Sequence, residues 1–304
     1  MSAPAPLPRH LAVLLLALLA SAFAANHIAA RIAFDHGTGL LLAILCRSGI
    51  TLLVLAGLVL WRGDSLRMTR QTWRWQSLLG LLIAIQSFCI YSAVARIPVA
   101  LALLVVNLAP ILLALLTWAL GGPRPTRRIA LLMGVILVGL LLALDVPTQL
   151  SGQQAVDAHW VEGVLFGLTG AAVFAYALWI TDHKLSGLPG TVRSMLTLLV
   201  VFAASALAGA AGVLPGGMDL PTAPAGWIAL GCLVLLYGMA FSALFILVTR
   251  LDIARNAPVM NIEPVAGLVF GWLILGQWLN GLQIVGGLIV VGGIVLLTYR
   301  RRPA

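Results

Sequence analysis

Two ionisable side chains lie deep inside long apolar segments of this chain. Glu263 is in the apolar run of residues 253–275, and Arg47 is in the run of residues 39–61. Charged groups at such places mark solute or ion pathways, because hydrocarbon does not solvate them. At about 1.5 Å per residue, Glu263 lies roughly 15 Å from one membrane surface and Arg47 roughly 12 Å from the opposite one. Their depths nearly match, so the two residues could form an ion pair. The alternatives are a static salt bridge, or an Arg47 side chain that reaches the membrane surface.

A carboxyl group in an apolar cavity could carry a proton. If Glu263 lies in such a cavity, we expect it to exchange protons near neutral pH, which makes the proton a candidate coupling ion. His27, which follows Asn26 in the first apolar run, is a second candidate, because histidine changes its charge near neutral pH. Without a partner nearby in the sequence, His27 is equally compatible with a packing role.

Two prolines interrupt apolar runs at equivalent places. Pro110 and Pro264 each follow an asparagine by three residues, Asn107 and Asn261. A proline inside a helix removes one backbone hydrogen bond and leaves a carbonyl that needs another partner. We expect hinges at the prolines, and the asparagines either satisfy the breaks or bind a solute.

Other polar and aromatic side chains inside the runs could line a cavity: Gln86, Tyr91, Tyr176, Trp179, Tyr237 and Phe241. Aromatic walls suit a flat organic or cationic solute. The alternative is anchoring at the membrane interface, above all for Trp179 near the end of its run.

The helices that position these residues follow from composition. Of the 304 residues, 62% are hydrophobic and 9% are charged, whereas soluble domains carry about 25% charged residues. Roughly 20 apolar residues span a bilayer as a helix. Ten apolar runs occur, at residues 11–33, 39–61, 76–95, 97–120, 128–145, 161–181, 192–213, 225–249, 253–275 and 281–299. We predict an all-α membrane protein with ten transmembrane helices in the lipid bilayer.

The basic residues indicate the orientation. With ten spans, fifteen of the 18 Lys and Arg residues fall on one side of the membrane, only Arg31 and Arg96 lie near the other, and Arg47 is within a span. The positive-inside rule then places both termini in the cytoplasm. We expect a multi-pass protein of the cell inner (plasma) membrane. The basic residues in the loops between spans account for the net charge of +9, so we expect no nucleic-acid partner.

The two ends of the chain carry further features. Ala22-Phe23-Ala24 is similar to a signal-peptide cleavage site, but the apolar run continues to Phe34, so we expect it to remain as a span. In the last run, four glycines form a smooth face that could meet a neighbouring helix or a second protomer of a homodimer: Gly286, Gly287, Gly292 and Gly293.

The chain also contains an internal repeat. A shift of 154 residues aligns Trp73 with Trp227, Arg96 with Arg250, Ala100 with Ala254, Asn107 with Asn261, Pro110 with Pro264 and Trp118 with Trp272. We therefore expect two halves, residues 1–150 and 151–304, with five spans each. Because five is odd, the second half must be inverted relative to the first. Many secondary transporters have this architecture, with the binding site near the midplane.

The repeated blocks Asn107-Leu-Ala-Pro110 and Asn261-Ile-Glu-Pro264, with the closing segment at residues 272–293, carry a family resemblance. The chain resembles the drug/metabolite transporter superfamily, specifically its EamA-type ten-helix branch. The resemblance implies a secondary active transporter, without a cofactor, that exports a small metabolite (an amino acid, an aromatic compound or a drug-like solute) by alternating access. An uptake permease of the same fold is the alternative. The family often has Glu where this chain has Gln277, which would remove any ion pair there.

An integral membrane enzyme is the alternative from a different class, and the sequence argues against it. The motifs G-x-S-x-G and H-E-x-x-H are absent, and His27 is the only histidine inside a run. The three cysteines lie singly in separate runs, without the spacing of a metal site. We expect no catalytic residues, no metal and no cofactor.

Overall fold

A computed structural model describes residues 7–146, 157–247, 251 and 257–298, and all regular structure in these ranges is helical. The helices are α1 (Arg9–Asp35), α2 (Leu40–Arg62), α3 (Arg70–Arg96), α4 (Val99–Val106), α5 (Ala109–Ala119), α6 (Arg127–Ala143), α8 (Ala158–Lys184), α9 (Gly190–Ala210), α10 (Pro224–Leu247), the 3-10 helix η1 (Ala257–Asn261), α12 (Ile262–Leu275) and α13 (Gly281–Thr298). Seven described segments, one of them α4 with α5, are long and apolar enough to cross a membrane, and Val259–Leu275 and Gly281–Leu296 are shorter apolar helices. The predicted all-α membrane class is confirmed.

Local signals set the helix ends close to those of the predicted runs. The Thr69 hydroxyl accepts a hydrogen bond from the Thr72 amide at 3.2 Å at the start of α3, and Asp157 accepts one from the His159 amide at 3.0 Å at the start of α8. Such caps satisfy amide groups that lack a partner within the helix. Gly63 and Gly276 end α2 and α12 in the left-handed region, at φ 65° and 61°, which other residues rarely adopt.

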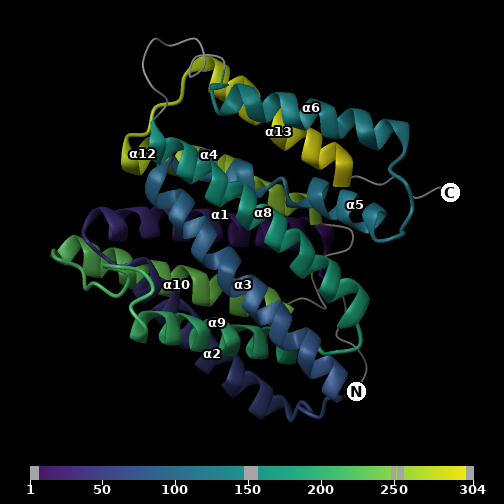
Figure 1. The fold of residues 1–304 in the computed structure, drawn as a ribbon, viewed down its shortest axis with the longest axis vertical. Coiled ribbons are helices and arrows are strands. Elements are labelled where there is room, and N and C mark those ends of the chain that lie inside the picture. The colour runs from purple at the N-terminus through teal and green to yellow at the C-terminus, as the bar shows by residue number, and fades with distance from the viewer. Residues whose placement is uncertain (1–6, 147–156, 248–250, 252–256, 299–304) are drawn as a thin grey trace.

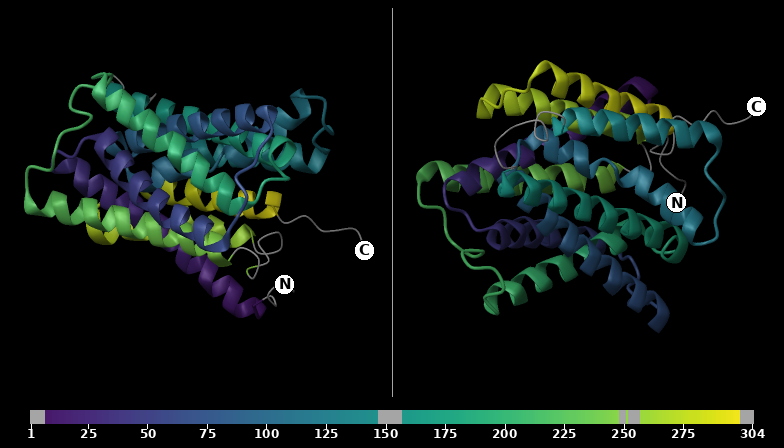
Figure 2. Two further views of the ribbon diagram at one scale, coloured as in Figure 1. Left: turned by 90° about the horizontal axis from the view of Figure 1, so that it is seen from below. Right: turned by 45° about the horizontal axis from the view of Figure 1, so that its top comes forward.

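The helices lie alongside one another in one bundle (Figure 1). Each of the main packing pairs joins a helix of residues 1–150 to one of residues 151–304: α1 with α10, α2 with α9, α3 with α8, and α6 with α13. The pair α6 and α13 lies at one edge of the bundle, and α2 and α9 lie at the opposite edge (Figure 1). Two further views show the same long helices side by side, and in the right view α6 lies next to the yellow helix α13 (Figure 2). The bundle is therefore assembled across the two halves.

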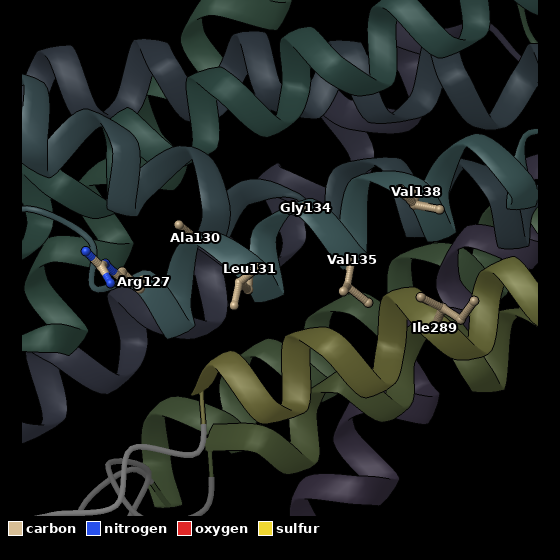
Figure 3. A pocket seen from close by; sticks show the side chains of 7 residues that line it. All are labelled: Arg127, Ala130, Leu131, Gly134, Val135, Val138 and Ile289. Carbon is tan, nitrogen blue, oxygen red and sulfur yellow. The ribbon is translucent and has the colours of Figure 1, made fainter.

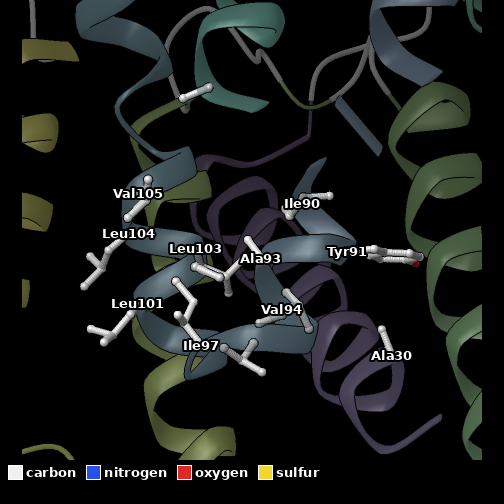
Figure 4. Close-up of a cluster of buried hydrophobic side chains, with 14 of the residues drawn as sticks. Ala30, Ile90, Tyr91, Ala93, Val94, Ile97, Leu101, Leu103, Leu104 and Val105 are labelled. Atoms are coloured by element: carbon white, nitrogen blue, oxygen red, sulfur yellow. The ribbon is translucent and has the colours of Figure 1, made fainter. Parts of the chain in front are cut away.

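The largest core cluster draws on many helices, and aliphatic side chains of α1, α3 and α4 make up a large part of it, among them Val94, Leu103 and Val105 (Figure 4). The outer surface is apolar as well. Leu53 on α2 and Leu131 on α6 are each 72% exposed. A soluble protein would bury so much apolar surface in an interface, whereas a bilayer covers it with lipid. This distribution agrees with a multi-pass membrane protein.

Glycines let α6 and α13 approach closely. A Cβ atom at Gly286 would collide with the backbone of Gly139 and Ala143 on α6, and one at Gly293 would collide with Ile136. Gly292, on another face of α13, has open space around it. Two of the four glycines expected to form a smooth face therefore pack against α6 of the same chain.

The chain breaks its helical path at both predicted proline positions. α4 ends at Val106 and α5 begins at Ala109, so that Pro110 is the second residue of α5, where its missing amide costs little. In the second half, η1 changes to α12 after Asn261, and Pro264 is the third residue of α12. A hinge motion at these breaks stays a prediction.

The contrast between Gly286 and Gly292 is testable. We expect Gly286→Leu to lower the free energy of unfolding by about 1–3 kcal/mol or more, because the side chain meets backbone that cannot move aside. Gly292→Leu should change it by less than about 1 kcal/mol, because the side chain enters open space and leucine favours a helix. Thermal unfolding of the two purified variants in one detergent measures both, and equal losses would contradict the close approach of α6 and α13.

Candidate functional site

A cavity of about 370 Å³ lies inside the bundle, between helices of both halves. Its wall is largely apolar. The polar and ionisable members of the wall are His27, Arg47, Gln86, Ser87, Asn107, Tyr237 and Glu263. A concave apolar site with a few converging polar groups is the usual form of a small-molecule site.

Glu263 pairs with His27 across this cavity. The Nε2 atom of His27, on α1, lies 3.6 Å from the Oε1 atom of Glu263, on α12. Glu263 is in the first turn of α12, where the helix dipole favours a negative charge. The other ring nitrogen of His27, Nδ1, is buried without a hydrogen-bond partner among the described residues. The two ionisable candidates of α1 and α12 therefore form one unit.

Arg47 is in the same wall but is not the partner of Glu263. Its side chain is buried, with the residue 5% exposed, so it does not extend to the membrane surface. The guanidinium carbon lies 4.5 Å from the centroid of the Tyr91 ring and 4.4 Å from that of Tyr237. Within the described part of the chain, no carboxylate oxygen lies within 4.0 Å of its nitrogens. Cation–π contacts thus take the place of the expected ion pair.

Hydrogen bonds fix Tyr91 beside Arg47. The Tyr91 hydroxyl donates to Oδ1 of Asn26 at 3.4 Å, and Nδ2 of Asn26 donates to the carbonyl of Leu233 at 2.8 Å. Asn26 is fully buried, and Figure 4 shows the Tyr91 ring pointing away from the aliphatic side chains of the core. The predicted residues Asn26 and Tyr91 therefore position Arg47 from α1 and α3.

Of the remaining predicted residues, some line the cavity and others lie at the junction of η1 and α12. Gln86, Asn107 and Pro110 line the cavity. The amide of Asn107 donates to the carbonyl of Leu103 at 2.8 Å, which ties it to its own helix. Asn261 is the last residue of η1, and Pro264 is buried in α12.

Tyr176 and Trp179 do not line this cavity. Their rings stack at 6.1 Å near the end of α8, and Trp179 also stacks on His183 at 4.8 Å. This arrangement agrees with the interfacial alternative, because an aromatic group near a helix end suits the headgroup region. Either role for the two residues stays a prediction.

Two aromatic residues of the cavity wall, Phe23 and Phe174, were not predicted from the sequence. Phe23 precedes His27 by four residues, so both lie on one face of α1. That spacing could have identified Phe23. Phe174 has no comparable signal, because Glu162, the charged residue of its run, lies at the start of the run and pairs with Arg96 outside the cavity.

Contacts between the halves join the loops at one end of the bundle. Loop atoms pair there, with the Gly39 amide donating to the Asp219 carbonyl at 2.9 Å. Nε of Arg96 lies 3.0 Å from Oε2 of Glu162, and Oε1 of Gln277 accepts from the Val99 amide at 3.1 Å. Gln277 therefore makes a hydrogen bond where the family pattern suggested an ion pair. Toward this end, the helices that line the cavity bury the side chains Ala30, Val94 and Leu233.

A larger hollow of about 790 Å³ lies along α6 and α13 at the edge of the bundle (Figure 3). Apart from Arg127 its lining is apolar, with Leu131, Val135 and Ile289 among the side chains. Leu131 and Val135 are exposed on the outer surface, which a bilayer would cover. Because it offers a solute no set of converging polar groups, we place the candidate site in the inner cavity.

Comparisons with known proteins agree with this arrangement. A family model described as the EamA-like transporter family matches residues 10–144 and 161–299. One solved crystal structure, described only as that of a protein, matches with a TM-score of 0.62 and 21% identity, over 96% of this chain and 99% of its own. At that identity the likeness shows a shared fold. No curated protein matches the chain.

The contact between Arg47 and Tyr91 can be tested through stability. Tyr91→Phe keeps the ring and should change the free energy of unfolding by about 1 kcal/mol or less, because the lost hydrogen bond is long. Tyr91→Leu removes the ring and should cost roughly 2 kcal/mol more. Thermal unfolding in detergent compares the two, with Tyr176→Leu as an aromatic control outside the cavity. A Phe variant as unstable as the Leu variant would show that the hydroxyl, and not the ring, is the important group.

Proposed function

The chain belongs to the EamA-like transporter family, and on that basis we propose that it is a secondary active transporter that exports a small metabolite across the inner membrane by alternating access. The observation that carries the proposal is the cavity between the halves, where Arg47 and the His27–Glu263 pair meet. Ionisable groups are retained inside a membrane bundle where they serve a pathway. Contacts between the halves at one end of the bundle support a state closed to one side of the membrane.

The helix pairing supports ten spans in two inverted halves. The family match covers two repeated segments of the chain. By their order in the two halves, α1 corresponds to α8, α2 to α9, α3 to α10 and α6 to α13. If each helix is exchanged with its counterpart, the pair α1 and α10 becomes the pair α8 and α3. The pair α2 and α9 and the pair α6 and α13 each remain the same pair. Such invariance is what a two-fold axis between inverted repeats requires. We also propose that both termini are in the cytoplasm, which an even number of spans and the positions of the basic residues support.

The pair of His27 and Glu263 supports coupling to protons. Its two groups are 3.6 Å apart in the cavity wall, so one proton could be shared between them or given to solvent in the cavity. Glu263 is carried by α12, next to the break after Asn261. A movement of α12 could therefore change the contact and release the proton on the other side.

We expect Glu263→Gln to remove the response of transport to a pH gradient, because the amide cannot exchange a proton. Glu162→Gln is the matched control, since it removes a carboxylate that pairs with Arg96 outside the cavity. The measurement is solute flux in proteoliposomes with an imposed pH gradient. A Glu263→Gln protein with the full pH dependence would exclude this carboxylate as the coupling group.

An untargeted comparison of metabolites can identify the transported solute. The chain and its Glu263→Ala variant would be expressed in a host that lacks related exporters, and the two culture media would be compared by mass spectrometry. We expect at least one compound to be enriched only by the unmodified chain, at equal membrane expression. A compound depleted from the medium would indicate uptake. No change with any solute, in cells or proteoliposomes, would contradict a transport function.

A further inference from the structure

Arg47 is a buried cation that meets no carboxylate in the described structure. Arg31 pairs with Asp35 at 3.0 Å and Arg96 pairs with Glu162 at 3.0 Å, both near the end of the bundle where loops of the two halves meet. In the cavity, the described partner of Glu263 is His27. Uncompensated charge in an apolar interior is expensive and persists where it serves a function.

The contacts of Arg47 hold it in place without neutralising it. Two tyrosine rings lie within 4.5 Å of the guanidinium carbon. Rings attract a cation through their faces, and the planar N–H groups of the guanidinium remain its means of binding an anion. Those groups match the two oxygen atoms of a carboxylate in a paired geometry. The site is therefore preformed for an anionic group.

An aromatic wall adjoins the guanidinium. The Tyr237 ring, which contacts Arg47, stacks on Phe241 at 5.3 Å and meets the edge of Phe23 at 6.1 Å. All four side chains line the same cavity. A flat apolar body could lie against these rings while its acidic group reaches Arg47.

From these observations, and resting on the transport function proposed above, we propose that Arg47 binds the substrate and that the substrate is a small organic carboxylate with an apolar or aromatic body. A cationic solute would place a second positive charge beside Arg47, and the carboxylate that could attract it is already in contact with His27. Aromatic rings without Arg47 would suit a cation. Beside Arg47 they instead contact the apolar body of an anionic solute. A cavity of about 370 Å³ suits a metabolite of this kind.

The test compares three probes of one shape: 3-phenylpropanoate, its amide 3-phenylpropanamide, and the amine 3-phenylpropylamine. Binding to the full chain in lipid nanodiscs is measured by calorimetric titration, without any gradient. We expect the acid to bind at least about tenfold more tightly than the amide, as a charge-assisted hydrogen bond requires, and the amine to bind most weakly. This ligand series needs no variant, so it decides even if substitutions at Arg47 impair folding.

Variants locate the preference. Arg47→Gln should bind the acid and the amide within about threefold of each other, and Arg47→Lys should keep part of the preference. Arg31→Gln is the matched control, because it removes an arginine that is paired outside the cavity. Three results would overturn the inference. The first is no binding of the acid. The second is binding of the amide or the amine that is as tight as that of the acid or tighter. The third is a loss of the preference in Arg31→Gln that is as large as in Arg47→Gln. Acid binding without flux of any solute would contradict the proposed function alone, whereas flux restricted to neutral or cationic solutes would contradict the inference alone.

Discussion

Inside a hydrocarbon layer no water can solvate a charge or hydrogen-bond an open backbone group, so every polar group must find its partner within the protein. The bundle meets this constraint in two ways: some polar side chains face a shared inner cavity, and others pair across helix interfaces. Asn26 bonds to the Leu233 carbonyl across the interface of α1 and α10. Arg47 rests on two tyrosine rings. The apolar residues of the same helices are left to pack together or to face lipid.

The helix breaks follow from the same constraint. At Asn107 the backbone leaves the helical path for two residues, and its side chain returns a hydrogen bond to the Leu103 carbonyl. The break borders the cavity, and so does the start of α12 with Glu263. Irregular backbone at membrane depth is tolerated where it is buried in protein or faces a cavity. Both halves therefore place a break in a helix beside the cavity.

Much of the fold could be predicted from the sequence, because long apolar runs, caps and prolines act locally. The runs at 39–61 and 76–95 correspond to α2 and α3, and the break before Pro110 falls where the proline requires it. The partner of Glu263 could not be predicted. His27 is far from it in sequence, and only the packing of α1 on α12 brings the two together at 3.6 Å. Depth in the membrane had suggested Arg47 as the partner of Glu263. Depth, however, does not determine which faces of two helices meet.

The pairing of helices across the halves has a consequence for how the protein is made. α1, α2, α3 and α6 each pack mainly on a helix from the second half, whereas contacts among the first-half helices are sparse. During synthesis, the first half must therefore remain in the bilayer without its partners, with Arg47 on α2 and neither Tyr237 nor the rest of α10 yet present. Either half expressed by itself would lack most of its interfaces. Because the interfaces lie between the halves, the two halves made as separate chains could still assemble in one membrane.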